Sequence, residues 1–392
     1  MPQVILSLNT GSSSVKCAAF MVRSGTVELI LKGAVDDLRS GAQAYIRDAD
    51  GTIEARANTD GLGGGDQPTQ WLVEQALTLI GEATTLAVVH RIVHGGTEFT
   101  SAVRVQPETL DALKRLAPMA PLHQMENLRP IEVISRNWPE LAQFACFDTA
   151  FHAGRSSVAK RFGLPLEYER KGVIRYGFHG LSYTFIAQQL ARLSPDVAAG
   201  RAIVAHLGSG ASLCAMCDGR GVDTTMSFSP LDGLIMGTRC GDLDPGALLY
   251  LIKEMQIDVD ALEELLYHGS GLLGVSGISA DVRRLLDSPE PAAREAIALY
   301  CYSIVRHLGS MLTSLGGLDA LVFTGGVGEH QPEIRRRVCQ SLSWLGLSLN
   351  LAANERGSGR ISTVDSSIEV WALATDEERV MAEQVAILLE GT

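Results

Sequence analysis

The sequence predicts an α/β protein built from two related halves. Strand-length apolar segments are interleaved with helix-length segments along the chain, which is the pattern of an α/β fold. The chain has 392 residues, more than one ordinary hydrophobic core holds, so we expect two domains. Two Gly/Ser-rich turns between strand segments lie about half a chain apart, which indicates an internal duplication. Because Gly/Ser turns are common, chance similarity is the alternative.

The first turn is Asn-Thr-Gly-Ser-Ser-Ser at residues 9–14. It lies between apolar segments at 4–8 and 15–22, so we expect a β-hairpin that carries Lys16 on its second strand. Backbone N–H groups and hydroxyls at such a tip suit a phosphate, although an ordinary Ser-rich hairpin has the same pattern. A Walker phosphate loop is excluded, because Val15 precedes the lysine and a strand follows it.

The second turn lies within Ile-Val-Ala-His-Leu-Gly-Ser-Gly-Ala-Ser-Leu at 203–213. Aligning Leu8 with Leu207 also aligns Gly11 with Gly210. Further strands are expected at 86–93, 144–148 and 320–323, and helices at 107–116, 184–193, 245–255, 292–315, 332–342 and 376–389.

Composition argues against several classes of partner. A net charge of −12 opposes broad binding to nucleic acid or to an anionic membrane, because both need a basic face. No apolar segment approaches the ~20 residues of a membrane span, and the N-terminus lacks a signal-peptide pattern, so we expect a cytoplasmic protein. The seven cysteines are expected to be reduced thiols.

A candidate substrate site is His-Arg-Ile-Val-His-Gly-Gly at 90–96. On a helix the two histidines could bind zinc together, but on a strand they are four rises of ~3.3 Å apart, too far for one ion. Strand alternation places Arg91 and Val93 on the opposite face. A guanidinium beside a small apolar side chain suits a short carboxylate, and an arginine in a surface ion pair is the alternative.

Three further polar residues end strands or lie in glycine-rich segments. Asp148 ends an apolar strand, which suits either a functional carboxylate or a turn cap. His179 precedes a helix and could face a phosphate or cap that helix. Arg239 is the one cation in the loop 229–245, where Asp244 before Pro245 predicts an N-cap rather than a metal ligand.

Two segments near the C-terminus complete the pattern. The glycine-rich residues 324–330 follow a strand and are compatible with a nucleotide, although the third glycine of the dinucleotide fingerprint is missing. Thr-Asp-Glu-Glu at 375–378 predicts a capping box in which Glu378 bonds back to Thr375. The predicted capping box does not use Glu377, so its carboxylate is available for another role.

Taken together, seven segments resemble the acetate kinase family in order and cover the chain from about residue 6 to 381. They are Asn-Thr-Gly-Ser-Ser-Ser-Val-Lys16, His-Arg-Ile-Val-His-Gly-Gly96, Phe-Asp-Thr-Ala-Phe-His152, Arg-Tyr-Gly-Phe-His-Gly180, His-Leu-Gly-Ser-Gly210, Met-Gly-Thr-Arg-Cys-Gly-Asp242 and Gly-Gly-Val-Gly-Glu329. The resemblance implies two duplicated ribonuclease-H-like lobes, as in actin and Hsp70, with ATP and Mg²⁺ in a cleft between them. We expect an N-terminal lobe at 1–149, joined by a C-terminal helix at 375–392, and a nucleotide-binding lobe at 150–374.

The same resemblance implies roles for individual residues. The residues that match positions at the transferring phosphoryl group are Arg91, Asp148, His179 and Arg239. Those that match the acetate pocket are Arg91, Val93, Leu122, Phe178 and Pro230, and those that match magnesium positions are Asn9 and Glu377. Those that match ATP contacts are Lys16, His206, Leu207, Gly208, Ser209, Gly210, Asp281, Val282, Arg283, Gly326, Val327, Gly328, Glu329 and His330.

The implied activity is reversible Mg-dependent phosphoryl transfer between ATP and acetate, giving acetyl phosphate and ADP, by a homodimer. Acetate is already ionised at neutral pH, so the transfer needs no general base and depends on cations. Asp148 is then expected to orient an arginine or a metal-bound water. Val93 favours acetate over a longer chain; a propionate kinase is the near alternative and an Hsp70- or actin-like ATPase the distant one.

The chain departs from the family pattern at three places. Ser209 stands where most members have Asn, and Asp376 stands where Asn is usual. Gln-Met-Glu at 124–126 replaces a usual Asn-Pro run, which leaves the shape of that pocket wall open.

Overall fold

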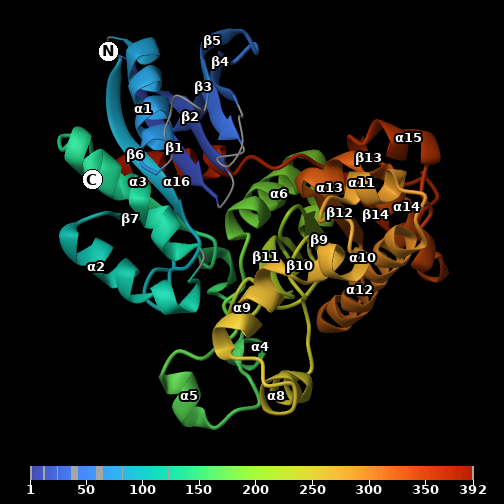
Figure 1. Cartoon of the computed structure of the whole chain (residues 1–392). Helices are drawn as coiled ribbons and strands as arrows, with labels where there is room; N and C mark the ends of the chain where they lie inside the picture. Colours follow the sequence, from blue (N-terminus) through green and yellow to red (C-terminus); the bar gives the residue numbers. More distant parts are fainter. Residues whose placement is uncertain are drawn as a thin grey trace. The chain divides into compact units, whose positions relative to one another are not determined.

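The computed structural model describes residues 2–11, 14–23, 25–36, 43–58, 65–81, 83–121 and 123–390. It divides into two compact units, Met1–Phe151 with Asp376–Thr392, and His152–Thr375. Each unit contains one sheet and its own helices, which confirms the α/β class (Figure 1). The serines at 12 and 13, in the first expected turn, lie outside the described residues.

The sheet of the first unit has the strand order β5-β4-β3-β2-β1-β6-β8-β7. Its strands are β1 (Gln3–Thr10), β2 (Ser14–Arg23), β3 (Thr26–Asp36), β4 (Gln43–Asp48), β5 (Ile53–Asn58), β6 (Thr84–Ile92), β7 (Val103–Arg104) and β8 (Gln143–Phe147). The pairing of β1 with β2 is antiparallel, as a hairpin requires, and confirms the first predicted turn. Strand β6 is parallel to both β1 and β8.

The sheet of the second unit has the order β11-β10-β9-β12-β14-β13. Its strands are β9 (Arg201–Leu207), β10 (Ala211–Cys217), β11 (Arg220–Thr224), β12 (Ala320–Thr324), β13 (Gly359–Arg360) and β14 (Glu369–Ala372). The β9–β10 hairpin encloses residues 208–210 and confirms the second predicted turn.

The two sheets repeat one pattern of strand polarity. In the first, β3, β2 and β1 are successively antiparallel, β6 and β8 follow in parallel, and β7 is antiparallel to β8. In the second, β11, β10, β9, β12, β14 and β13 have the same sequence of relations. This match supports an internal duplication, to which the first unit adds β4 and β5.

Alternation along β1 decides which side chains enter the core of the first unit. Leu6 and Leu8 pack in one cluster with residues of α1 (Gln67–Ile80) and α3 (Gln124–Asn137). Since successive residues of a strand point to opposite faces, Asn9 points to the other face. There it meets α16 (Glu377–Glu390), the C-terminal helix that belongs to this unit (Figure 1).

The remaining helices fall into the two units. Helix α2 (Pro107–Arg115) packs with α3 in the first. Those of the second are α4 (Ser157–Lys160), α5 (Leu166–Arg170), α6 (Gly180–Leu193), α7 (Pro195–Ala198), α8 (Pro245–Lys253), α9 (Val259–His268), α10 (Gly271–Ser276), α11 (Val282–Asp287), α12 (Pro291–Leu315), α13 (Gly325–His330), α14 (Pro332–Ser341) and α15 (Leu351–Arg356). All six predicted helices are present, with ends within a few residues. Asp244 caps α8, as predicted, by accepting from the Gly246 N–H.

The two histidines of the segment 90–96 are structural. Strand β6 carries His90, whose Nε2 lies 2.8 Å from Gln143 Oε1, and His94 Nδ1 accepts from the Gly96 N–H. Burial lowers the pKa of each imidazole to about 4, so both rings are neutral at pH 7. The described residues contain no group of three or more His, Cys, Asp or Glu that could hold a metal ion.

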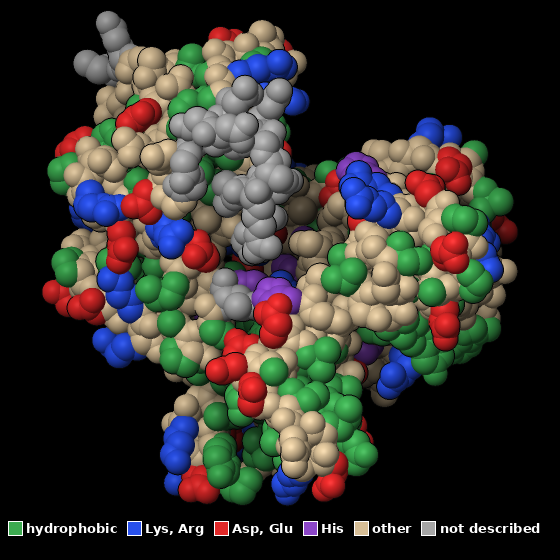
Figure 2. All heavy atoms as spheres, in the orientation of Figure 1, with side chains coloured by type: hydrophobic (Ala, Val, Ile, Leu, Met, Phe, Trp, Pro, Cys, Tyr) green, Lys and Arg blue, Asp and Glu red, His purple; other side chains and the backbone are tan. Residues whose placement is uncertain are grey.

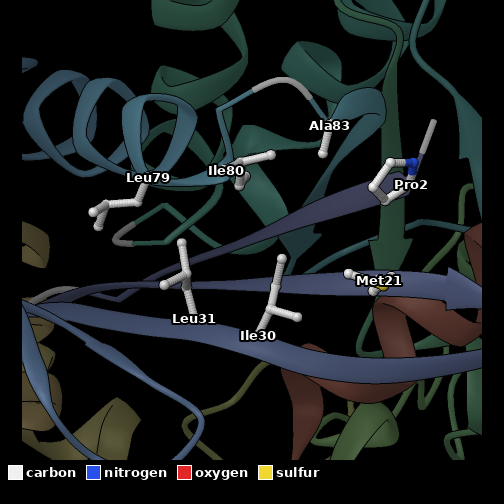
Figure 3. Close-up of a pocket in the computed structure, with 7 residues that line it drawn as sticks. All are labelled: Pro2, Met21, Ile30, Leu31, Leu79, Ile80 and Ala83. Atoms are coloured by element: carbon white, nitrogen blue, oxygen red, sulfur yellow. The ribbon is translucent and has the colours of Figure 1, made fainter.

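The surface of the first unit carries an apolar groove of about 450 Å³. Figure 3 shows side chains from β2, β3 and the end of α1 around it; the lining residues are Pro2, Met21, Ile30, Leu31, Leu79, Ile80 and Ala83. None of these side chains is charged, and none of the predicted site residues lines the groove. On the visible face of the molecule, basic and acidic side chains are interspersed (Figure 2).

Candidate active site

Arg91 and Asp148 form the centre of the site in the first unit. Arg91 lies near the end of β6, and Asp148 directly follows β8, the parallel neighbour of β6. The carboxyl ends of parallel strands meet at one sheet edge, so the two side chains come together. Arg91 Nε donates to Asp148 Oδ1 at 3.0 Å and Nη2 donates to Oδ2 at 2.7 Å. This is a bidentate pair, the strongest geometry available to a guanidinium and a carboxylate.

The same guanidinium also reaches β1 and α16. Arg91 Nη1 donates to Asn9 Oδ1 at 3.2 Å and lies 3.0 Å from Glu377 Oε2. Asn9 Nδ2 donates to Glu377 Oε2 and to Glu378 Oε1, each at 3.1 Å. Two sequence-predicted residues, Asn9 and Glu377, therefore meet across nearly the whole length of the chain.

The charge of this group is negative. One guanidinium faces the carboxylates of Asp148, Glu377 and Glu378, all buried. Burial alone would lower the pKa of Arg91, but Asp148 and Glu377 raise it above its usual value, so Arg91 stays charged. A hard divalent cation fits the oxygen donors here, because Mg²⁺ needs only one or two carboxylates when phosphates and waters supply its other ligands.

The predicted capping box at 375–378 is wrong. Glu378 bonds to Asn9, and the Thr375 hydroxyl is buried without a hydrogen-bond partner among the described residues. Asp376 takes the capping position, since its Oδ1 accepts from the Arg379 N–H at 3.1 Å. The first turn of α16 thus presents two carboxylates to the site, where the sequence pattern had assigned one.

The segment after β6 is held by α3. Val93 N–H donates to Asn127 Oδ1 at 2.9 Å, and the Gln124 side chain bonds to both the N–H and the C=O of His94. Gln124, which departs from the family pattern, therefore fixes the backbone beside Val93. Leu122, predicted for the same pocket, lies outside the described residues. Lys16 is exposed on β2 and pairs with Asn9 across the hairpin.

In the second unit, two predicted residues, His179 and Arg239, converge on the β9–β10 turn at Gly210. A β-carbon placed on Gly210 would lie 3.3 Å from His179 Nε2 and 3.5 Å from Arg239 Nη1. Arg239 Nη1 also donates to the Pro230 carbonyl at 2.9 Å. Burial lowers the pKa of Arg239. The glycine therefore leaves space in which a guanidinium and an imidazole approach one backbone turn, an arrangement suited to a phosphate.

His179 is fixed from two sides. It precedes α6 with φ 57°, a left-handed backbone that few non-glycine residues adopt. Its Nδ1 lies 2.8 Å from Ser212 Oγ, and its ring stacks on that of His206 with centroids 4.2 Å apart. Ser182 Oγ lies 2.9 Å from His206 Nδ1. No sequence pattern gave a role to Ser182, Tyr183 or Ser212. Ser212 lies in the quoted segment 203–213, whereas Ser182 and Tyr183 lie between the quoted segment that ends at Gly180 and the helix predicted from residue 184.

The loop that carries Arg239 is anchored to α12. Asp242 Oδ2 lies 2.8 Å from His307 Nε2, and the Asp242 side chain also interacts with Asp232, which bonds to Ser227. Burial alone would lower the pKa of His307, but the Asp242 hydrogen bond and charge raise it above its usual value. Burial opposes ionisation of Asp242 too, yet His307 lowers its pKa. Each partner therefore favours the charged form of the other.

The residues predicted for the nucleotide have mainly structural contacts within the second unit. A β-carbon placed on Gly325 would lie 2.8 Å from the Leu207 carbonyl oxygen, so the start of α13 lies close to the end of β9. Glu329 Oε1 accepts from the Gly325 N–H, whereas the His330 side chain is exposed. Asp281 caps α11 and pairs with the exposed Arg283. Val282 is buried and Ser209 is exposed. Phe178, which was predicted for the acetate pocket, is also buried.

The comparisons with known proteins agree with this arrangement of elements. Residues 4–383 match the acetokinase family, so the chain belongs to that family. It is 47% identical over its full length to an acetate kinase of Rhodopseudomonas palustris strain TIE-1, all of which is covered, and 42% identical over 99% of its length to an acetate kinase of Rhizobium meliloti, 98% of which is covered.

Two solved structures are similar to this one. The acetate kinase of Porphyromonas gingivalis has a TM-score of 0.84 at 33% identity, with 99% of this chain and 100% of that chain covered. A propionate kinase from Francisella tularensis has a TM-score of 0.85 at 30% identity, with 97% and 98% covered. The resemblance inferred from the seven sequence segments is thereby confirmed.

The ion pair of His307 with Asp242 predicts a pH-dependent contribution to stability. A raised histidine pKa adds stability that is complete below the unfolded pKa, ~6.5, and is lost as pH rises through the folded value. The lowered pKa of Asp242 adds stability above ~3.9 that is lost as pH falls through its folded value. We expect His307→Gln to lower stability by roughly 1 kcal/mol or less near pH 6, because half-exposed Asp242 is screened, and by less above pH 8.

Thermal melting between pH 5 and 9 measures this difference. His268→Gln, at an exposed position of α9, is the matched control and should show no such trend. A deficit in His307→Gln that stays constant with pH would mean that the contact is a neutral hydrogen bond.

Proposed function

We propose that this protein is an acetate kinase that transfers the γ-phosphoryl group of ATP to a carboxylate oxygen of acetate, giving acetyl phosphate and ADP, in a reversible reaction. Besides membership of the acetokinase family, the observation that carries the proposal is the approach of Arg239 and His179 to the glycine turn at Gly210. A partly buried guanidinium and an imidazole beside free backbone space suit a phosphoryl group. An Hsp70- or actin-like ATPase transfers no phosphoryl group to a small carboxylic acid, so it would not need these two side chains beside an acetate site.

The chemistry places its main demand on cations. Acetate is ionised at neutral pH, so no proton has to be removed before its oxygen attacks phosphorus. Arg91 would hold acetate and phosphoryl oxygens, Arg239 would neutralise the charge that develops on the transferring group, and His179 would donate a hydrogen bond to it. Asp148, with both oxygens on Arg91, is suited to hold that guanidinium in place rather than to act as a base.

The ATP side of the proposal rests on the second unit. The turn of His206 to Gly210 would contact phosphate oxygens through its backbone, and Lys16 would contribute a cation. The segments 281–283 and 326–330 would hold the nucleoside. Val282 is buried, so its contribution would come from the backbone, whereas Arg283 and His330 are exposed and able to reach a ligand.

Magnesium would be held near Asn9, Glu377 and Glu378. The excess of buried carboxylates over cations at this place supports a bound divalent ion. The ion would neutralise phosphate charge. Hydrogen bonds assign the Asn9 amide, with its nitrogen toward the glutamates and its oxygen toward Arg91. A cation bound beside the glutamates would favour the opposite orientation of the amide, with its oxygen toward the glutamates.

We also propose a cytoplasmic homodimer. In the part of the chain that the structure describes, no helix has the length and apolar character to cross a membrane. Around α8 and α9 the second unit exposes several large apolar side chains: Leu249, Tyr250, Ile252, Met255, Val259 and Leu265. A patch of this kind suits contact with a second copy.

Arg239→Ala should lower kcat by about 10³-fold, roughly 4 kcal/mol, because it removes a cation aimed at transition-state charge. Arg91→Ala should do the same but also lower the melting temperature, because Asp148 loses its bidentate partner. Steady-state kinetics in both directions, with melting of each variant, measure these effects.

Arg360→Ala is the matched control, since Arg360 forms only a surface pair with Glu369 and contacts nearby loop oxygens of the second unit. Its kcat should stay near the wild-type value. Near-normal turnover of a folded Arg239→Ala enzyme would refute the role given to that residue.

Glu377→Gln and Glu378→Gln should each raise the Mg²⁺ concentration that gives half-maximal activity, because each removes one of the two carboxylates that share Asn9. Titration of activity with Mg²⁺ measures the change, with Glu383→Gln on the same helix as the control. An unchanged requirement in Glu378→Gln would assign the metal to Glu377 alone.

Val93 bears on the choice between acetate and propionate. One methylene in an apolar pocket is worth ~1–3 kcal/mol, so we expect propionate to be a poor substrate rather than an excluded one. Val93→Ala should raise kcat/KM for propionate relative to acetate by about tenfold, mainly through KM.

Val133→Ala, a buried valine of α3, controls for loss of packing and should leave that ratio unchanged. If Val93→Ala leaves it unchanged as well, another side chain sets the depth of the pocket and the propionate alternative gains support.

A further inference from the structure

We propose that Tyr183 and Ser212 are positioning residues that set the tautomer of His179, so that the neutral imidazole carries its proton on Nε2, the atom facing Gly210. The inference deepens the function proposed above and rests on the role given there to His179.

The two hydroxyls lie behind the imidazole. Ser212 is on β10, paired with His206 of β9, and Tyr183 is in the first turn of α6, which follows His179. Ser212 Oγ lies within hydrogen-bond distance of both His179 Nδ1 and the Tyr183 hydroxyl. Both Tyr183 and Ser212 are 0% exposed, so water does not compete for these bonds.

The Ser212 hydroxyl has one proton, so it can donate to only one of its two partners, His179 Nδ1 or the Tyr183 hydroxyl. If Tyr183 donates to Ser212, then Ser212 donates to Nδ1, and the imidazole proton must be on Nε2. Burial raises the pKa of Tyr183 well above its usual value, so the phenol keeps its proton at neutral pH and can donate. The reverse direction would place the proton on Nδ1 and turn the lone pair of Nε2 toward Gly210.

The position of Nε2 decides between these directions. It is the His179 atom nearest to a β-carbon placed on Gly210, on the side where Arg239 also lies. An N–H there would attract phosphate oxygen, whereas a lone pair would repel it. The same device occurs at the stacked neighbour, since Ser182 of α6 places a hydroxyl on His206 Nδ1.

Nitrogen NMR of the full-length protein labelled with ¹⁵N-histidine tests the assignment directly, because the two tautomers have distinct nitrogen shifts and ring-proton couplings. His179→Asn, which tolerates a left-handed backbone, identifies the His179 signals by their loss. We expect Nε2–H in the wild type and a mixture with Nδ1–H in both Tyr183→Phe and Ser212→Ala. A wild-type Nδ1–H tautomer would overturn the proposal.

Kinetics supply the second measurement. We expect kcat of Tyr183→Phe to fall about tenfold, the factor that one net hydrogen bond carries, with KM for acetate and ATP changed less than about twofold. Tyr300→Phe is the matched control. Tyr300 is a buried tyrosine of α12 whose hydroxyl has no hydrogen-bond partner among the described residues, so that variant should keep both kcat and the His179 spectrum.

The two measurements separate the inference from the function on which it rests. An unchanged tautomer in folded Tyr183→Phe and in folded Ser212→Ala would refute the positioning role, whatever happens to the rate. A changed tautomer with an unchanged kcat would support that role and refute the hydrogen bond from His179 in the proposed reaction.

Discussion

The ion pair of Arg91 with Asp148 is the interaction on which the first unit's site depends. The guanidinium uses all three of its nitrogens, Nε and Nη2 for Asp148 and Nη1 for both Asn9 and Glu377. It thereby joins the ends of β1, β6 and β8 to the first turn of α16. Three buried carboxylates around one cation would be unstable if that cation were lost. The C-terminal helix is therefore part of the site through charge as well as through packing.

The second unit has the same strand pattern but a different kind of site. At the hairpin of its sheet the requirement is space, and the absent side chain at Gly210 lets Arg239 and His179 approach the turn. Each of these is held by groups behind it: the Pro230 carbonyl for Arg239, and Ser212 for His179. Negative charge thus gathers in one unit and hydrogen-bond donors in the other, although the sheets share one topology. Duplication accounts for the scaffold, and the loops account for the chemistry.

Local sequence patterns predicted elements well where the deciding interactions are local. The hairpins at both Gly/Ser turns and the cap at Asp244 depend on residues a few positions apart. The capping box failed for an instructive reason. Thr-x-x-Glu has the same sequence whether the glutamate bonds back to its own helix or accepts from a distant amide, and Asn9 supplied that amide. Strands β3, β4 and β5 were not predicted, because their mixed polar and apolar sequences gain order from pairing in succession, β3 with β2, β4 with β3 and β5 with β4.

The sequence by itself determined the α/β class, the alternation that sends Leu8 into the core and Asn9 to the opposite face, and the family to which the chain belongs. Only the tertiary structure decided that Glu378 joins Glu377 at Asn9, that Gln124 holds the backbone of His94, and that Ser212 lies between Tyr183 and His179. The physical reason is the separation along the sequence over which each interaction acts. Turn and cap chemistry acts over a few residues, whereas a contact between side chains of different elements depends on strand order and register, which the packing of the whole unit sets.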